Sequence, residues 1–213
     1  MTVFKVIPQK DELLEEIFKE SMKELNEFYE INWVHHLPII MVVDGRTTID
    51  GLKQEKSQPW SIGWSEGKTI YVLDRNNLEK ESSHKYRLDT YSALIKHEIS
   101  HSFYNILSGN QHKPVWLCEG TAIYTSGQNK FKKTPTKFKE FLEFYDQGGS
   151  DVYLESGFFV QMLVEKFGKQ KLFELIRESR NTDTKEAFNK LFSEKYGFEL
   201  NYDDFNKKMF NYA

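Results

Sequence analysis

Helical patterns dominate the second half of the sequence, and they limit the folds open to the chain more than any other feature does. From about Leu88 onward, apolar residues recur at intervals of three and four positions, which is the spacing of one face of an α-helix. Glycine and proline separate these segments, as expected where helices begin and end. The predicted helices are residues 88–107, 114–126, 136–146, 151–167, 169–180, 184–196 and 202–211.

The first half predicts one helix and a small sheet. DELLEEIFKESMKELNEFYE, residues 11–30, is amphipathic at helical spacing. LPIIMVVDG, residues 37–45, predicts a short strand that ends at Asp-Gly, and SIGWSEGKTIYVLD, residues 61–74, predicts two strands around a Ser-Glu-Gly turn. Residues 46–60 show no clear period and are predicted to form a loop.

Strands followed by a run of helices are typical of an α+β protein. The 213 residues fit the usual size of one domain, or of two lobes that share a core. We therefore expect a single α+β domain, residues 1–213, with an N-terminal lobe of about 1–109 that contains the sheet. The C-terminal lobe, about 110–213, is expected to be helical, and the boundary is expected near Gly109.

Charge and composition exclude several kinds of partner. The net charge of −3 and the pI of about 6.1 argue against nucleic acid, and the five lysines of NKFKKTPTKFK, residues 129–139, are interpreted as a solvated surface. Cys118 is the only cysteine, which excludes an intramolecular disulfide, and we interpret it as a small buried hydrophobic residue. No apolar run is long enough for a membrane span or a signal peptide, so we expect no membrane partner and a cytoplasmic location.

The segment HEISH, residues 97–101, carries the pattern with the clearest chemistry. His97 and His101 stand four positions apart within a predicted helix, so both imidazoles lie on one face and can reach the same ion. Glu98 lies about 100° around that helix from His97, beside the ion rather than on it. This is the position of a general base next to a metal site.

A catalytic zinc site usually has three protein ligands, so a third ligand is required. PVWLCEGTAIY, residues 114–124, predicts a second helix that would carry Glu119 inward. Gly120 and Ala122 are expected to let this helix pack closely on the histidine helix. The alternative reading leaves His97 and His101 as exposed polar groups. His35, His36, His84 and His112 are interpreted as solvated or capping residues.

HEISH together with CEGTA resembles the gluzincin zinc metallopeptidases, in particular the peptidase MA-like catalytic domain of the aminopeptidase N type. The resemblance covers roughly residues 38–212. It implies a zincin-like fold, in which a small N-terminal sheet and an active-site helix precede a helical lobe. It also implies one Zn²⁺ per chain bound by His97, His101 and Glu119, with Glu98 as the general base.

VYLESGFFVQMLVEKFG, residues 152–168, is similar to a further segment of that family, whose tyrosine stabilises the oxyanion. The resemblance implies this role for Tyr153, although Glu155 and Ser156 stand where the family often has lysine and glycine. The alternative is that Tyr153 merely begins an amphipathic helix. No counterpart of the G-A-M-E-N signature precedes the histidine helix, so an aminopeptidase specificity is not implied.

These features predict a zinc metallopeptidase that hydrolyses a peptide or protein substrate. By analogy, residues 69–74 are expected to bind an extended peptide as an added edge strand. Two other functions stay open. The first is a catalytically silent zincin-like module that binds peptides, and the second is a zinc hydrolase of a non-peptide amide. The sequence leaves the oligomeric state open.

Overall fold

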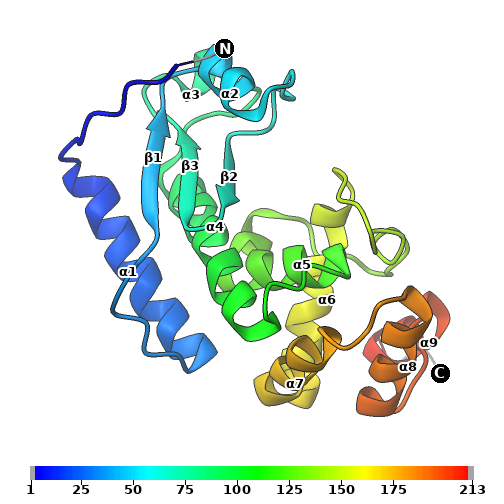
Figure 1. Ribbon diagram of the computed structural model, residues 1–213. Coiled ribbons are helices and arrows are strands. Elements are labelled where there is room, and N and C mark those ends of the chain that lie inside the picture. Colours follow the sequence, from blue (N-terminus) through cyan, green and yellow to red (C-terminus); the bar gives the residue numbers. More distant parts are fainter. Residues whose placement is uncertain (1–2, 211–213) are drawn as a thin grey trace. The chain divides into compact units, whose positions relative to one another are not determined.

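The computed structural model describes residues 3–210 of the chain (Figure 1). The chain divides into two compact units, Met1–Ile99 and Ser100–Ala213. The division falls inside the long helix α4 (Leu88–Ser108), ten positions before Gly109. Helices and a small three-stranded sheet make this an α+β protein, as predicted. Among the described residues, no helix combines the length and the apolar character needed to cross a membrane.

The first unit contains the sheet. Its elements before α4 are α1 (Glu12–Tyr29), β1 (Ile39–Val43), α2 (Arg46–Lys53), β2 (Gly63–Glu66), β3 (Thr69–Leu73) and α3 (Leu78–Glu81). The strand order is β1-β3-β2, with β1 parallel and β2 antiparallel to β3 (Figure 1). The predicted strands and the helix at residues 11–30 are confirmed.

The central position of β3 overturns one expectation. β3 pairs with β1 along one side and with β2 along the other, so its backbone N–H and C=O groups are already used in the sheet. The prediction that residues 69–74 receive a peptide as an added edge strand is therefore wrong. Of the three strands, β1 and β2 are the ones with an open edge.

The predicted loop at residues 46–60 is also wrong in part, because α2 occupies Arg46–Lys53. This helix has one fully buried residue, Ile49, so its sequence lacks the repeating apolar pattern from which a helix is predicted. Tertiary contacts hold it instead. The Arg46 guanidinium donates hydrogen bonds to main-chain carbonyl groups, including those of Ser61 at 2.8 Å and Glu81 at 2.8 Å, while the Glu81 carboxylate accepts from the Arg46 N–H.

Helix α4 contacts the sheet in its first two turns. The Tyr91 hydroxyl donates a hydrogen bond of 2.9 Å to the carbonyl of Leu73 at the end of β3. Gly63 of the edge strand β2 lies so close to α4 that a Cβ atom there would be 3.1 Å from Leu94 Cδ1. Since Leu94 precedes His97 by three positions, β2 runs beside the part of α4 that leads to the HEISH motif.

The second unit is helical around an aromatic core. It contains α5 (Val115–Ser126), the 3₁₀ helix η1 (Gln128–Phe131), α6 (Val152–Phe167), α7 (Lys169–Ser179), α8 (Lys185–Tyr196) and α9 (Tyr202–Phe210). Among its described residues, the fully buried aromatic side chains are Phe103, Tyr104, Trp116, Phe138, Phe141, Phe159, Phe173, Phe188, Phe192 and Phe205. The predicted helices here are confirmed within one residue at each end, except 136–146; Asn211, the predicted end of the last one, lies outside the described residues.

Residues 136–146 form an irregular segment in place of the predicted helix. Phe138 and Phe141 have helical spacing. However, side chains of α6 and α9 form hydrogen bonds with backbone N–H and C=O groups of this segment, and these bonds replace those of a helix. The Tyr202 hydroxyl accepts from the N–H groups of Phe141 and Leu142, both at 2.8 Å. The Asn206 amide bonds the N–H and the carbonyl of Phe138. The Glu155 carboxylate accepts from the N–H groups of residues 139 and 140.

Candidate metal centre

Helix α4 places His97 and His101 one turn apart, as predicted. The histidine His97 is 5% exposed and the neighbouring Glu98 is 6% exposed, while His101 is partly buried. The alternative that the two motif histidines are exposed polar groups is therefore wrong. The other four histidines of the sequence are all exposed, which agrees with their interpretation as solvated or capping residues.

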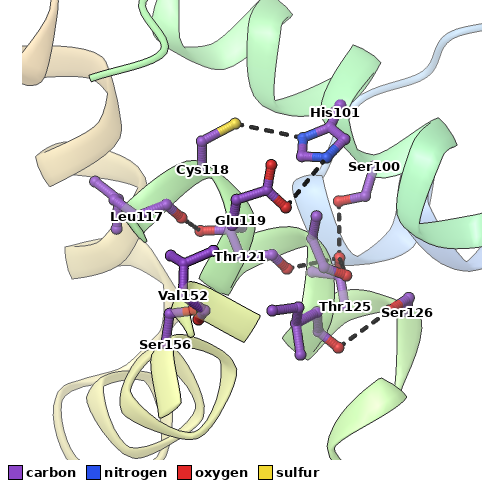
Figure 2. A network of polar contacts seen from close by, with 12 residues as sticks. Ser100, His101, Leu117, Cys118, Glu119, Thr121, Thr125, Ser126, Val152 and Ser156 are labelled. Atoms are coloured by element: carbon purple, nitrogen blue, oxygen red, sulfur yellow. Dashed lines mark hydrogen bonds and ion pairs between the residues drawn. The ribbon is translucent and has the colours of Figure 1, made fainter. Parts of the chain in front are cut away.

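Helix α5 brings Glu119 to the same place. Glu119 Oε2 lies 3.7 Å from His101 Nε2 (Figure 2). One ligand atom from each of His97, His101 and Glu119 can be chosen so that all three lie within 4.8 Å of one another. Glu98 is not part of this group, which agrees with a position beside an ion rather than on it.

The donor set fits a zinc ion. Zinc binds imidazole nitrogen and carboxylate oxygen at about 2.0–2.2 Å, so two ligands of a tetrahedral ion are about 3.4 Å apart. The 3.7 Å between His101 and Glu119 is close to that separation and requires only a small contraction. Two histidines and one glutamate are a recurring ligand set of catalytic zinc, in which the fourth position is left to water or substrate.

Cys118 orients one of the candidate ligands, which the sequence interpretation missed. The cysteine is 4% exposed, as expected for a buried hydrophobic residue, but its Sγ also lies 3.3 Å from His101 Nδ1 (Figure 2). Metal-binding histidines are commonly oriented by a group at the second ring nitrogen. Cys118 therefore holds the His101 ring with Nε2 toward Glu119. Nothing in the sequence distinguishes this cysteine from a packing residue.

The close packing of α5 involves a different helix from the one expected. A Cβ atom on Gly120 would lie 2.6 Å from the carbonyl oxygen of Ser156 and 2.9 Å from Val160 Cγ2, and both residues belong to α6. The expectation that Gly120 packs on the histidine helix is therefore wrong. The contact of α5 with α4 includes a hydrogen bond of 2.8 Å between Thr125 and Ser100, next to His101 (Figure 2).

Tyr153 lies in the first turn of α6 and is partly buried. Its main-chain carbonyl accepts a hydrogen bond of 2.8 Å from Lys132 Nζ. The role of its hydroxyl as an oxyanion donor stays a prediction. Two residues further along α6, Glu155 is 5% exposed and holds the irregular segment through the backbone N–H groups of residues 139 and 140. That structural role accounts for a carboxylate at this position.

Lys132 departs from the interpretation of residues 129–139 as a solvated surface. The other four lysines of this stretch are exposed, but Lys132 is partly buried. Burial lowers the pKa of Lys132 to about 8, and the charge of Glu119 acts in the opposite direction and raises it. The Tyr153 carbonyl that Lys132 binds lies one turn before Ser156 on α6, and Ser156 packs against Gly120, the residue after Glu119. No sequence signal separates this lysine from its four neighbours.

We expect Lys132→Met to change the pH dependence of stability in the metal-free protein. The folded-state pKa of Lys132 is about 8, below the ordinary value of 10.5, so between these pH values the unfolded chain binds more protons. The free energy of unfolding of the wild type therefore rises as pH increases from about 8 to 10.5. Below pH 8, the buried charge of Lys132 lowers the stability of the wild type by its full amount. The unfolding free energy of Lys132→Met relative to wild type should fall by roughly 2 kcal/mol as pH rises through the window, after allowance for partial exposure.

Chemical denaturation at pH 7 and pH 10.5 measures this difference. Lys133→Met is the matched control, because Lys133 is exposed and should give no such change. Equal pH profiles for the Lys132 and Lys133 variants would show that the Lys132 ammonium is solvated.

Comparison of the chain with protein-family models, curated proteins and solved structures gives no match.

Proposed function

We propose that this protein is a zinc-dependent metallopeptidase of the gluzincin type with a zincin-like fold. The observation that carries the proposal is the group His97, His101 and Glu119, whose ligand atoms lie within 4.8 Å of one another, with the buried Glu98 directly after the first histidine. Burying a carboxylate and imidazoles is costly unless they are paired or coordinate a metal. The proposal gives each of these four side chains a chemical task.

Zinc bound by these residues supplies a Lewis acid that polarises a carbonyl group and increases the acidity of water. Glu98 then accepts the proton of the attacking water and passes it to the leaving nitrogen. Tyr153 donates a hydrogen bond to the oxyanion that develops on the former carbonyl oxygen. The low exposure of Glu98 limits access of bulk water to the base.

An extended peptide is the substrate that suits the sheet. In place of β3, the edge strand β2 is the candidate partner, because β2 lies beside α4 at Leu94, three positions before His97. A peptide added to an open strand edge gains main-chain hydrogen bonds that do not depend on its sequence. Side-chain pockets would then select among peptides.

Zinc binding is the first test. Elemental analysis of zinc-reconstituted protein should give one zinc per chain, and Glu119→Gln should weaken zinc binding by more than about 100-fold, because loss of residues that merely support ligands already costs 10- to 100-fold. Glu165→Gln, which changes an exposed carboxylate, is the control and should bind zinc like wild type. Zinc affinity unchanged by Glu119→Gln would place the third ligand elsewhere.

Peptide cleavage is the second test of the proposal. Zinc-loaded protein is incubated with a broad peptide library, and new termini are identified by mass spectrometry, with chelator-stripped protein as the control. Cleavage that requires zinc supports the peptidase. Zinc binding with no peptide cleavage would favour a silent peptide-binding module or a hydrolase of non-peptide amides.

A further inference from the structure

Lys132 binds the first turn of α6, and the next turn of α6 packs against α5 at Gly120, the residue after the candidate ligand Glu119. It directly follows η1, which continues the chain after the Glu119 helix α5. Its Nζ donates one hydrogen bond, to the carbonyl of Tyr153 at 2.8 Å. An ammonium group has three donors, so within residues 3–210 two of the Lys132 donors have no protein acceptor. Lys132 thus retains hydrogen-bonding capacity within about one helical turn of the α5–α6 contact that adjoins Glu119.

The metal centre itself does not need this charge. A divalent zinc ion is already balanced by the carboxylates of Glu98 and Glu119, and both histidines bind as neutral imidazoles. With zinc bound, the Lys132 ammonium is a positive charge in excess of that balance. Buried charges are normally paired, so a partly buried excess cation favours an anion supplied from outside the protein.

A purely structural role explains the residue less well. The hydrogen bond to the Tyr153 carbonyl needs only a neutral donor, which an amide or hydroxyl side chain provides without burying a charge. Burial of the lysine charge lowers the free energy of unfolding, and a neutral side chain would form the same hydrogen bond without this cost. Residues that cost stability are typical of functional sites.

We infer that Lys132 is a specificity residue that binds a carboxylate group of the substrate next to the metal centre. The inference rests on the proposed peptidase function, since it assigns the class of peptide that the site takes. A carboxylate reaches the site either as the free C-terminus of a peptide or as an aspartate or glutamate side chain. An ammonium–carboxylate hydrogen bond contributes to recognition in both cases.

The test uses zinc-loaded full-length protein and matched peptides from the cleaved library sequences. One pair differs by a C-terminal carboxylate or amide, and the second pair, both amidated, differs by glutamate or glutamine near the cleavage site. Wild type should prefer the carboxylate form of at least one pair by about 10- to 100-fold in kcat/KM, as expected for a hydrogen bond to a charged group. The pair that shows the preference identifies the source of the carboxylate.

Three variants determine whether Lys132 causes the preference. Lys132→Met should reduce the ratio to near one, Lys132→Arg should keep most of it, and Lys133→Met should leave it as in wild type. An equal carboxylate preference in wild type and Lys132→Met would overturn the inference, because the metal alone would then bind the carboxylate. Equal rates for both members of each pair in wild type would overturn it as well, while leaving the peptidase proposal intact.

A binding measurement separates this inference from the proposed function. Acetyl-trialanine and its C-terminal amide are titrated into zinc-loaded Glu98→Gln, with and without Lys132→Met, by calorimetry. Tighter binding of the acid that is lost with Lys132→Met supports the carboxylate site even if wild type cleaves no peptide, which would contradict only the peptidase. Identical binding of acid and amide in both proteins would contradict a C-terminal carboxylate site.

Discussion

Glu98→Gln is expected to lower kcat by about 100- to 10,000-fold while zinc content stays near one per chain, because general acid–base catalysis typically contributes a factor of that size. Glutamine keeps the shape of the side chain and its ability to form hydrogen bonds, but an amide does not accept the proton of the attacking water. Glu98 lies outside the three-residue ligand group, so the metal should remain bound.

The measurement is kcat on a library-derived peptide together with zinc content and thermal stability of the same preparation. Glu119→Gln is the contrasting variant, since its activity should return in part when zinc is raised, whereas that of Glu98→Gln should not. Wild-type kcat in a fully zinc-loaded Glu98→Gln protein would show that another group is the base and would end the mechanism proposed here.

Gly120→Val is expected to destabilise the protein by about 3 kcal/mol, at the upper end of the usual cost of overpacking. A Cβ atom at this position meets the main-chain carbonyl of Ser156 at 2.6 Å, and main chain inside a helix does not move aside as a flexible side chain does. Helix propensity alone predicts the opposite sign, because valine is favoured over glycine in a helix. The sign of the change therefore reports on the packing of α5 against α6.

Denaturant unfolding of metal-free protein measures this effect. Gly148→Ala is the control, because a Cβ atom there would meet Val115 Cγ1 at an ordinary contact distance of 3.7 Å. That variant should be neutral or slightly stabilising. A stabilised Gly120→Val protein would show that α5 and α6 are further apart than described.

The parts of the site that sequence predicted are those that depend on local geometry. His97 and His101 lie on one face of α4 because the helical period places positions four apart together, and the period is visible in residues 88–107. Glu119 was predicted as a ligand because a third ligand is required and because residues 114–124 have the pattern of a second helix that carries it. The α+β class followed from strands that precede helices, because each strand and most helices carry their own repeating pattern.

The parts that sequence did not predict depend on long-range contacts. Cys118 and Lys132 gain their significance from His101, Tyr153 and Glu119, which no local pattern connects with them. Helix α2 is held by the contacts of Arg46 rather than by an apolar face. The central place of β3 is a matter of strand order, which the separate strand patterns do not contain.

The dependence of the irregular segment at residues 136–146 on α9 makes the end of the chain a remote support of the candidate site. Tyr202 and Asn206 of α9 bind the backbone of this segment, and its residues Phe144 and Tyr145 in turn accept hydrogen bonds of 2.9 Å from the first N–H groups of α5. Those groups have no partner within their own helix. Removal of α9 (Tyr202–Phe210) would delete both of these side chains and loosen the start of the Glu119 helix, so a chain without α9 is a poor substitute in any assay of metal binding.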